Sequence, residues 1–122
     1  MDWTKPTTQL LGRFQPWHQG HTELFKRAHA TTGQCVLLVR KTPLDENNPL
    51  DVVKVMDNIV EALTTEGFTL DEDYIIMVVP NITDISYGRD VGYSITQHDL
   101  GEDVHKISAT EIRKQMRARG EI

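Results

Sequence analysis

Apolar residues along this chain fall into three short runs. They occupy residues 9–14, 36–39 and 74–79, and the second run is uninterrupted and partly β-branched. Such runs are typical of strands in a parallel sheet that is covered on its faces. The first run has Gly12 near its end, which predicts a strand that leads into a tight turn with exposed backbone.

Segments with the periodicity of amphipathic helices connect these runs. Apolar positions between residues 20 and 31 recur as on one helix face, and Gly33 is a stop signal. A second helix is predicted over residues 48–66, with Asn48 as its N-cap and Pro49 at its first position.

The last third of the chain is less regular. Residues 82–95 carry two glycines and scattered apolar residues, which predicts a loop with one short strand at residues 92–96. A closing helix is predicted over residues 108–119, where Ser108 and Glu111 fit the S-x-x-E capping box.

The alternation of strand and helix favours right-handed βαβ crossovers and one compact domain over residues 1–122. We therefore expect an α/β fold, a Rossmann-like three-layer α/β/α domain with a parallel sheet. Ligands bind such sheets at the carboxyl ends of the strands. The segments predicted to meet there are residues 12–21, residues 40–49 and the chain from Pro80 onward.

Charge and composition limit the classes of partner that the chain is expected to bind. Lys and Arg total 13 against 18 Asp and Glu, a formal net charge of −5, so the surface as a whole does not attract nucleic acid. An anionic ligand would need a local concentration of cations and backbone donors. The N-terminal residues lack the apolar stretch of a signal peptide, and no apolar run approaches about 18 residues. We expect a cytoplasmic protein with no membrane contact, and Cys35, the single cysteine, to be buried as a small hydrophobic residue.

The segment at residues 12–21, GRFQPWHQGH, combines several phosphate-binding features. Gly12 and Gly20 allow close approach of the backbone to a ligand, and the predicted helix N-terminus adds free N–H groups. His18 and His21 are spaced to donate hydrogen bonds to one oxyanion. Two alternatives remain: zinc binding by the histidine pair, although a stable site needs three or four ligands, and simple capping of the helix.

Residues 107–113, ISATEIR, form a second polar segment at a predicted helix start. Ser108 and Thr110 supply hydroxyls, and Arg113 supplies a fixed cation one turn further on, a set that suits a triphosphate tail. The alternative is that Ser108 and Glu111 form only a capping box, and both interpretations can hold together.

Both segments resemble motifs of one family. GRFQPWHQGH is similar to the G-R-F-Q-P-F/W-H-x-G-H signature of the HxGH nucleotidyltransferase superfamily, the cytidylyltransferase-like group, and ISATEIR resembles its I-S-x-T-x-x-R motif. The resemblance implies catalytic roles for His18, His21 and Arg113. The nucleotide-binding residues that it implies are Gly12, Arg13, Phe14, Gly20, Ile107, Ser108 and Thr110.

The implied reaction transfers a nucleoside monophosphate from a nucleoside triphosphate to a small phosphate-bearing acceptor, releasing pyrophosphate. Mg²⁺ would be held mainly by substrate phosphates and water. Both motifs are more similar to the nicotinamide-mononucleotide adenylyltransferase branch, which uses ATP, whereas the short chain resembles the glycerol-phosphate cytidylyltransferase branch. ATP is therefore favoured over CTP. The alternative is a catalytically silent nucleotide-binding sensor or regulatory module.

Residues that follow the second and third predicted strands are candidates to bind the acceptor. The candidates are Lys41, Tyr87 and Arg89, together with their neighbours Arg40, Asp84 and Asp90. The alternative for Arg40 and Lys41 is a solvated basic pair, because long cationic side chains are usually exposed. Relatives in this superfamily are often homo-oligomers. Trp3 and the N-terminal arm could pack on a neighbouring copy, and the alternative is that Trp3 folds back on its own domain.

Overall fold

The protein forms a three-stranded parallel sheet with flanking helices. It is described by a computed structural model that covers residues 1–89 and 92–122. The strands are β1 (Thr8–Gly12), β2 (Cys35–Arg40) and β3 (Tyr74–Val79), in the order β1-β2-β3. The predicted α/β class, Rossmann-like with a parallel sheet, is confirmed. The predicted three-layer arrangement differs in the described residues, because both crossover helices cover the same face of the sheet.

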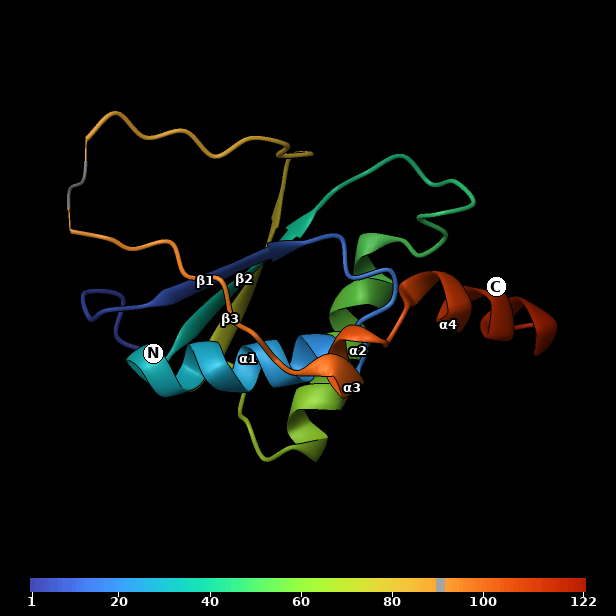
Figure 1. Ribbon diagram of the computed structural model, residues 1–122, viewed down its shortest axis with the longest axis horizontal. Helices are drawn as coiled ribbons and strands as arrows, with labels where there is room; N and C mark the ends of the chain where they lie inside the picture. The colour runs from blue at the N-terminus through green and yellow to red at the C-terminus, as the bar shows by residue number, and fades with distance from the viewer. Residues whose placement is uncertain (90–91) are drawn as a thin grey trace.

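Two helices make the crossovers between the strands. Helix α1 (Gln19–Thr32) joins β1 to β2, and α2 (Val52–Thr65) joins β2 to β3. Because right-handed crossovers step through the sheet in one direction, both helices lie on the same face of it, as Figure 1 shows. Gly33 ends α1 as predicted, in the left-handed conformation with φ 79°.

The start of α2 differs from the prediction. The N-cap is Asp51, whose carboxylate accepts the Lys54 N–H at 2.9 Å, and not Asn48. Asn48 instead binds back to Asp45, since its backbone N–H and side-chain amide both donate to Asp45 Oδ1, at 2.7 and 2.9 Å. A local turn therefore takes up the residues that the sequence assigned to the first helical turn.

The hydrophobic core lies between the sheet and these two helices. Leu10, Leu37 and Ile76 are paired across the three strands on the helix side of the sheet. The most deeply buried core members are Phe25 and Ala28 of α1, Cys35, Leu37 and Val39 of β2, Val55, Ile59 and Leu63 of α2, and Tyr74 of β3. The opposite face of the sheet is less covered, with Met77 45% exposed.

Cys35 is fully buried, as predicted. Burial, with a smaller contribution from the nearby Asp73 carboxylate, raises the pKa of its thiol to about 12. The thiol is therefore protonated and acts as a small apolar side chain.

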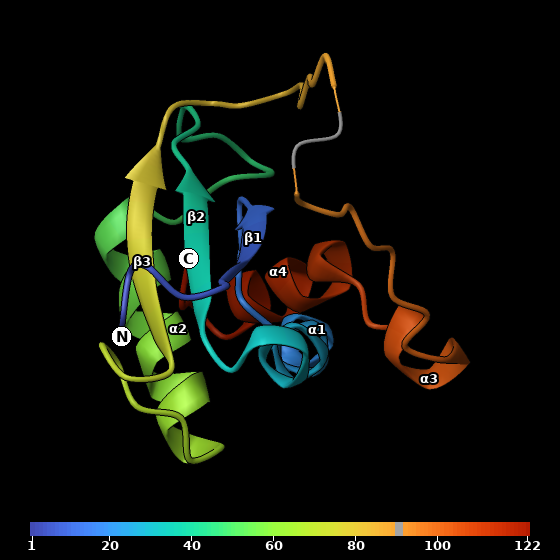
Figure 2. The same ribbon diagram turned by 90° about the vertical axis from the view of Figure 1, so that its left-hand side faces the viewer.

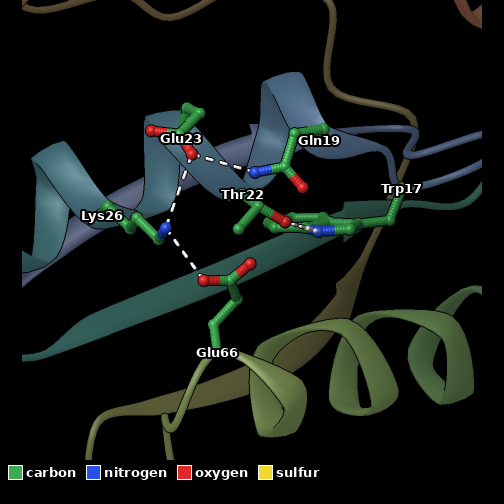
Figure 3. Close-up of polar contacts among 6 residues, drawn as sticks. All are labelled: Trp17, Gln19, Thr22, Glu23, Lys26 and Glu66. Atoms are coloured by element: carbon green, nitrogen blue, oxygen red, sulfur yellow. Dashed lines mark hydrogen bonds and ion pairs between the residues drawn. The ribbon is translucent and has the colours of Figure 1, made fainter.

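Polar contacts join the two crossover helices at their edges (Figure 3). The Lys26 ammonium lies 2.9 Å from the Glu66 carboxylate and 3.5 Å from that of Glu23, which connects α1 to the residue that ends α2. Beside them, the Trp17 indole N–H donates to the Thr22 hydroxyl at 2.9 Å. The ring of Trp17 is thereby fixed at the start of α1.

The chain after β3 departs from the predicted pattern. The strand predicted at residues 92–96 is absent: Gly92 has φ 90°, and Tyr93 and Ile95 are exposed without a paired strand. A four-residue helix that the sequence did not predict, α3 (Glu102–His105), contacts α1 instead. The closing helix is confirmed as α4 (Ala109–Ala118), and it lies beyond the end of the sheet (Figures 1 and 2).

Two further expectations concern partners. Across residues 1–89 and 92–122, none of the helices has the length and apolar character needed to span a membrane. Trp3 is 75% exposed and does not fold back onto its own domain. Association of copies stays a prediction.

Leu37 tests the core assignment. Its side chain is fully buried in the central strand, so Leu37→Ala is expected to lower the free energy of unfolding by roughly 2–5 kcal/mol through lost burial and a residual cavity. Leu44 is 63% exposed, and Leu44→Ala should change the free energy of unfolding by less than about 0.5 kcal/mol. Chemical denaturation followed by circular dichroism measures both, and equal losses would contradict this core.

Candidate functional site

The connection from β1 to α1 is shaped by two residues. Phe14 has a positive φ of 53°, which is rare for a residue with a side chain, and its ring is 95% buried, since only 5% is exposed. The ring lies against the end of β1, because a Cβ at Gly12 would come within 2.8 Å of Phe14 Cε1. Gly12 is therefore needed for close contact with Phe14, whereas the sequence had suggested contact with a ligand.

Gln15 joins three distant segments at this connection. Its side-chain amide donates to Leu50 O at 2.7 Å and accepts the Leu50 N–H at 2.9 Å, a paired bond in a buried setting. Its backbone oxygen accepts a hydrogen bond from Arg113 Nη1 at 2.7 Å, across 98 residues of sequence. The β1–α1 connection, the loop before α2 and helix α4 are thus held together at one residue that the sequence analysis did not single out.

The two histidines form a reciprocal cap at the start of α1. His18 is the N-cap, and its Nδ1 accepts the Gly20 N–H at 3.0 Å, while Nδ1 of His21 accepts the His18 N–H at 3.1 Å. The rings are stacked with centroids 3.9 Å apart. Because each Nδ1 accepts a backbone N–H, each neutral ring carries its proton on Nε2. The capping interpretation is confirmed, and each ring keeps an Nε2–H donor outside the cap.

Aromatic neighbours surround His21. The ring of Phe14 meets it edge-on at 5.1 Å, and that of Trp17 lies at 5.2 Å. Burial, with a smaller contribution from His18, lowers the pKa of His21 to about 3, and burial also lowers the pKa of His18. His21 is therefore a neutral hydrogen-bond donor at physiological pH.

Gly20 lies between the histidines for a steric reason. A Cβ at this position would come within 2.8 Å of His18 Cε1 and 3.0 Å of its Nδ1. Any side chain here would displace the capping ring.

The second polar segment begins α4 as predicted. Ser108 is the N-cap, and its hydroxyl accepts the Glu111 N–H at 3.3 Å. Arg113, only 8% exposed, donates from Nη2 to the Thr110 hydroxyl at 3.2 Å as well as to Gln15. Ile107 is half-buried just before the helix. Arg113 is therefore held against the connection that carries the histidines.

Three guanidinium groups gather around the joint between Arg113 and the β1–α1 connection. Burial, followed by the charges of Arg117 and Arg13, lowers the pKa of Arg113. Arg13 Nη1 donates to Asn48 Oδ1 at 3.4 Å, and Arg117 donates to the backbone oxygen of Glu46. An acidic protein thus has a local concentration of positive charge next to a helix N-terminus, an arrangement that can bind an anion such as a polyphosphate.

Other predicted residues are not brought to this joint. The side chain of Lys41 is exposed, and only its backbone N–H is bonded, to Val79 O at 2.9 Å. Tyr87 is 60% exposed and contacts Tyr93 edge-on at 6.1 Å between centroids, and Arg89 is exposed beside it. Asp90 lies outside the described residues.

The described residues, 1–89 and 92–122, contain no group of three or more His, Cys, Asp or Glu side chains placed to hold a metal ion. The histidine pair therefore lacks the third protein ligand that a zinc site requires within that part of the chain.

Comparison with known proteins yields no assignment. No protein-family model matches the chain, and no curated protein matches it. The function of the site must be inferred from its residues and their geometry.

The buried state of His21 predicts a pH-dependent stability. Folding lowers its pKa from 6.5 to about 3, so the unfolded state binds the proton more tightly. Above pH 6.5 this difference in pKa does not affect the free energy of unfolding. As the pH falls below 6.5, the unfolded state takes up a proton that the folded state does not, and the free energy of unfolding decreases by about 2 kcal/mol at pH 5. Between pH 7 and pH 5, denaturant unfolding should show that the wild-type protein loses about this much more stability than His21→Gln. Equal losses in the two proteins would contradict a neutral, buried His21.

Proposed function

We propose that this protein is a nucleotidyltransferase that transfers a nucleoside monophosphate from a nucleoside triphosphate to a small phosphate-bearing acceptor and releases pyrophosphate. One observation carries the proposal. The His18–His21 cap leaves two neutral Nε2–H donors at a helix N-terminus, beside a cluster of arginines that Arg113 joins to the same connection. The resemblance of residues 12–21 and 107–113 to the superfamily's two motifs supports the same reaction.

In the proposed reaction an oxygen of the acceptor phosphate attacks the α-phosphorus of the triphosphate. The bond from the α-phosphorus to the bridging oxygen breaks, and its electron pair leaves with pyrophosphate. The attacking oxygen is already anionic, so the site needs no strong general base. Catalysis then consists of positioning and of stabilising the charge that develops on the phosphate oxygens.

The chain's own groups divide these tasks. His18 and His21 donate from Nε2 to the α-phosphate oxygens, and the low pKa of His21 keeps it from taking a proton from solvent. Arg113, with Arg13 and Arg117, attracts the β- and γ-phosphates that become pyrophosphate. Mg²⁺ is expected to enter with the triphosphate, bound by phosphate oxygens and water, where it would neutralise part of the phosphate charge.

A nucleotide-binding sensor without turnover is the second candidate. It is favoured by the predicted acceptor residues, since the side chains of Lys41, Tyr87 and Arg89 are exposed and no hydrogen bond or ring contact joins them to the histidines within residues 1–89 and 92–122. A sensor would bind the triphosphate and release no pyrophosphate.

Thermal unfolding with MgATP, MgCTP, MgGTP and MgUTP tests the binding step. A triphosphate at about a hundred times its dissociation constant should stabilise the fold by roughly 2.7 kcal/mol and raise the melting temperature. The largest rise is expected with ATP, on the similarity of both motifs to the ATP-using branch. Failure of all four nucleotides to shift the transition would contradict the proposal.

His18→Asn tests the chemical step while preserving the helix. Asparagine is a strong N-cap, so the fold should persist while an imidazole donor is lost, and pyrophosphate release should fall roughly 100- to 1,000-fold. His21→Ala should lower pyrophosphate release by a similar factor. Gln19→Ala is the matched control, because Gln19 is the next residue and, among the described residues, its side chain is hydrogen-bonded to Glu23 alone. This variant should keep activity within about twofold. Near wild-type release from both histidine variants would overturn the proposed roles.

A further inference from the structure

A cavity lies at the carboxyl ends of the strands, on the face of the sheet opposite the two crossover helices. The cavity has a volume of about 330 Å³ and is lined by Leu11, Arg40, Ile82, Thr83, Asp84 and Ile85. Leu11 and Gly12 are consecutive in β1, so they face opposite sides of the sheet. Gly12 faces the ring of Phe14 and the histidine connection, so the cavity lies across β1 from the proposed phosphate site.

Arg40 gives this cavity a cation that forms no ion pair with any carboxylate of residues 1–89 and 92–122. Of its three guanidinium nitrogens, only Nη2 has an acceptor in the described part of the chain, Asn81 Oδ1 at 2.9 Å. Its Nε is buried with no hydrogen-bond partner there, and the carboxylates of those residues form no ion pair with it. A guanidinium group with a single hydrogen bond to Asn81 keeps donors for an anionic ligand in the cavity.

Asp84 gives the same cavity an acceptor of opposite charge. Its carboxylate is bonded by the Ser86 hydroxyl, which leaves lone pairs for hydroxyl or amine donors of a ligand. The apolar residues of the lining are Leu11, Ile82 and Ile85. A simple inorganic anion would satisfy Arg40 but would be repelled by Asp84.

We propose that this cavity binds a small anionic polyol, such as a sugar phosphate, with its anionic group on Arg40 and its hydroxyl groups on Asp84. This assignment is independent of the proposed function, because it rests on the residues that line the cavity. The volume of about 330 Å³ is at the lower end of the roughly 300–1,000 Å³ typical of small-molecule sites and suits a ligand of the size of a sugar phosphate. Arg40, and not the exposed Lys41, is then the residue after β2 that binds the anionic group of the ligand.

Isothermal titration calorimetry of the whole chain tests this site with three probes: ribose 5-phosphate, ribose and inorganic phosphate. The wild-type protein should bind ribose 5-phosphate more tightly than either of the others. Arg40→Met should weaken that binding at least about tenfold, which corresponds to roughly 1.4 kcal/mol. Asp84→Asn should reduce the preference for ribose 5-phosphate over inorganic phosphate. Arg27→Met, which removes an exposed cation of α1, should bind as the wild type does.

MgATP titrations on the same proteins separate the two proposals. All variants are expected to bind MgATP within about twofold of the wild type. Binding of MgATP without measurable binding of ribose 5-phosphate would overturn the cavity assignment alone. Arg40-dependent binding of ribose 5-phosphate without binding of any nucleotide would uphold the cavity and overturn the nucleotidyltransferase. Loss of binding in Lys41→Met, with Arg40→Met unchanged, would also overturn the cavity assignment.

Discussion

The buried hydrogen bonds of Gln15 are the constraint on which the candidate site depends. The side chain of Gln15 is bonded to both backbone groups of Leu50, and its carbonyl oxygen accepts from Arg113. Buried polar groups of this kind strongly favour one arrangement, because breaking any one bond leaves an unsatisfied donor or acceptor. Loops that follow two different strands and a helix near the end of the chain are thereby fixed relative to one another.

The histidine pair serves structure and chemistry through different ring nitrogens. The Nδ1 atoms of His18 and His21 satisfy backbone N–H groups at the start of α1, which every helix must satisfy in some way. That commitment sets the tautomer and leaves Nε2–H as the donor. Burial against Phe14 and Trp17 keeps His21 neutral. The cap therefore prepares the rings to stabilise phosphate charge without a proton transfer.

The sheet separates two regions with different electrostatic character. On the helix side, the arginines around Arg113 make an anion-binding region in a chain whose net charge is −5. On the other side, Arg40 and Asp84 place both signs of charge around one cavity. A polyphosphate suits the first region and an anionic polyol the second, and β1 lies between them.

Local patterns determined the strands, the two crossover helices and the caps at His18, Gly33 and Ser108, because these depend on residues within about four positions of one another. The class of fold followed from their order. The two polar motifs, residues 12–21 and 107–113, could also be recognised in the sequence, since each lies within one short segment. Gln15 was not singled out, although a polar residue between Phe14 and Trp17 is a signal that it is buried and bonded.

Tertiary structure alone decided the contacts between distant segments. The bonds that join Gln15 to Leu50 and Arg113 span 35 and 98 residues, and no local pattern encodes such a pairing. Asn48 had a good N-cap sequence, but hydrogen bonds to Asp45 moved the start of α2 to Asp51. Residues 92–96 had an acceptable strand pattern, but a strand forms only where a sheet edge is aligned to pair with it. Propensity thus fixed the three strands and the two crossover helices in outline, and long-range hydrogen bonds fixed which residues meet.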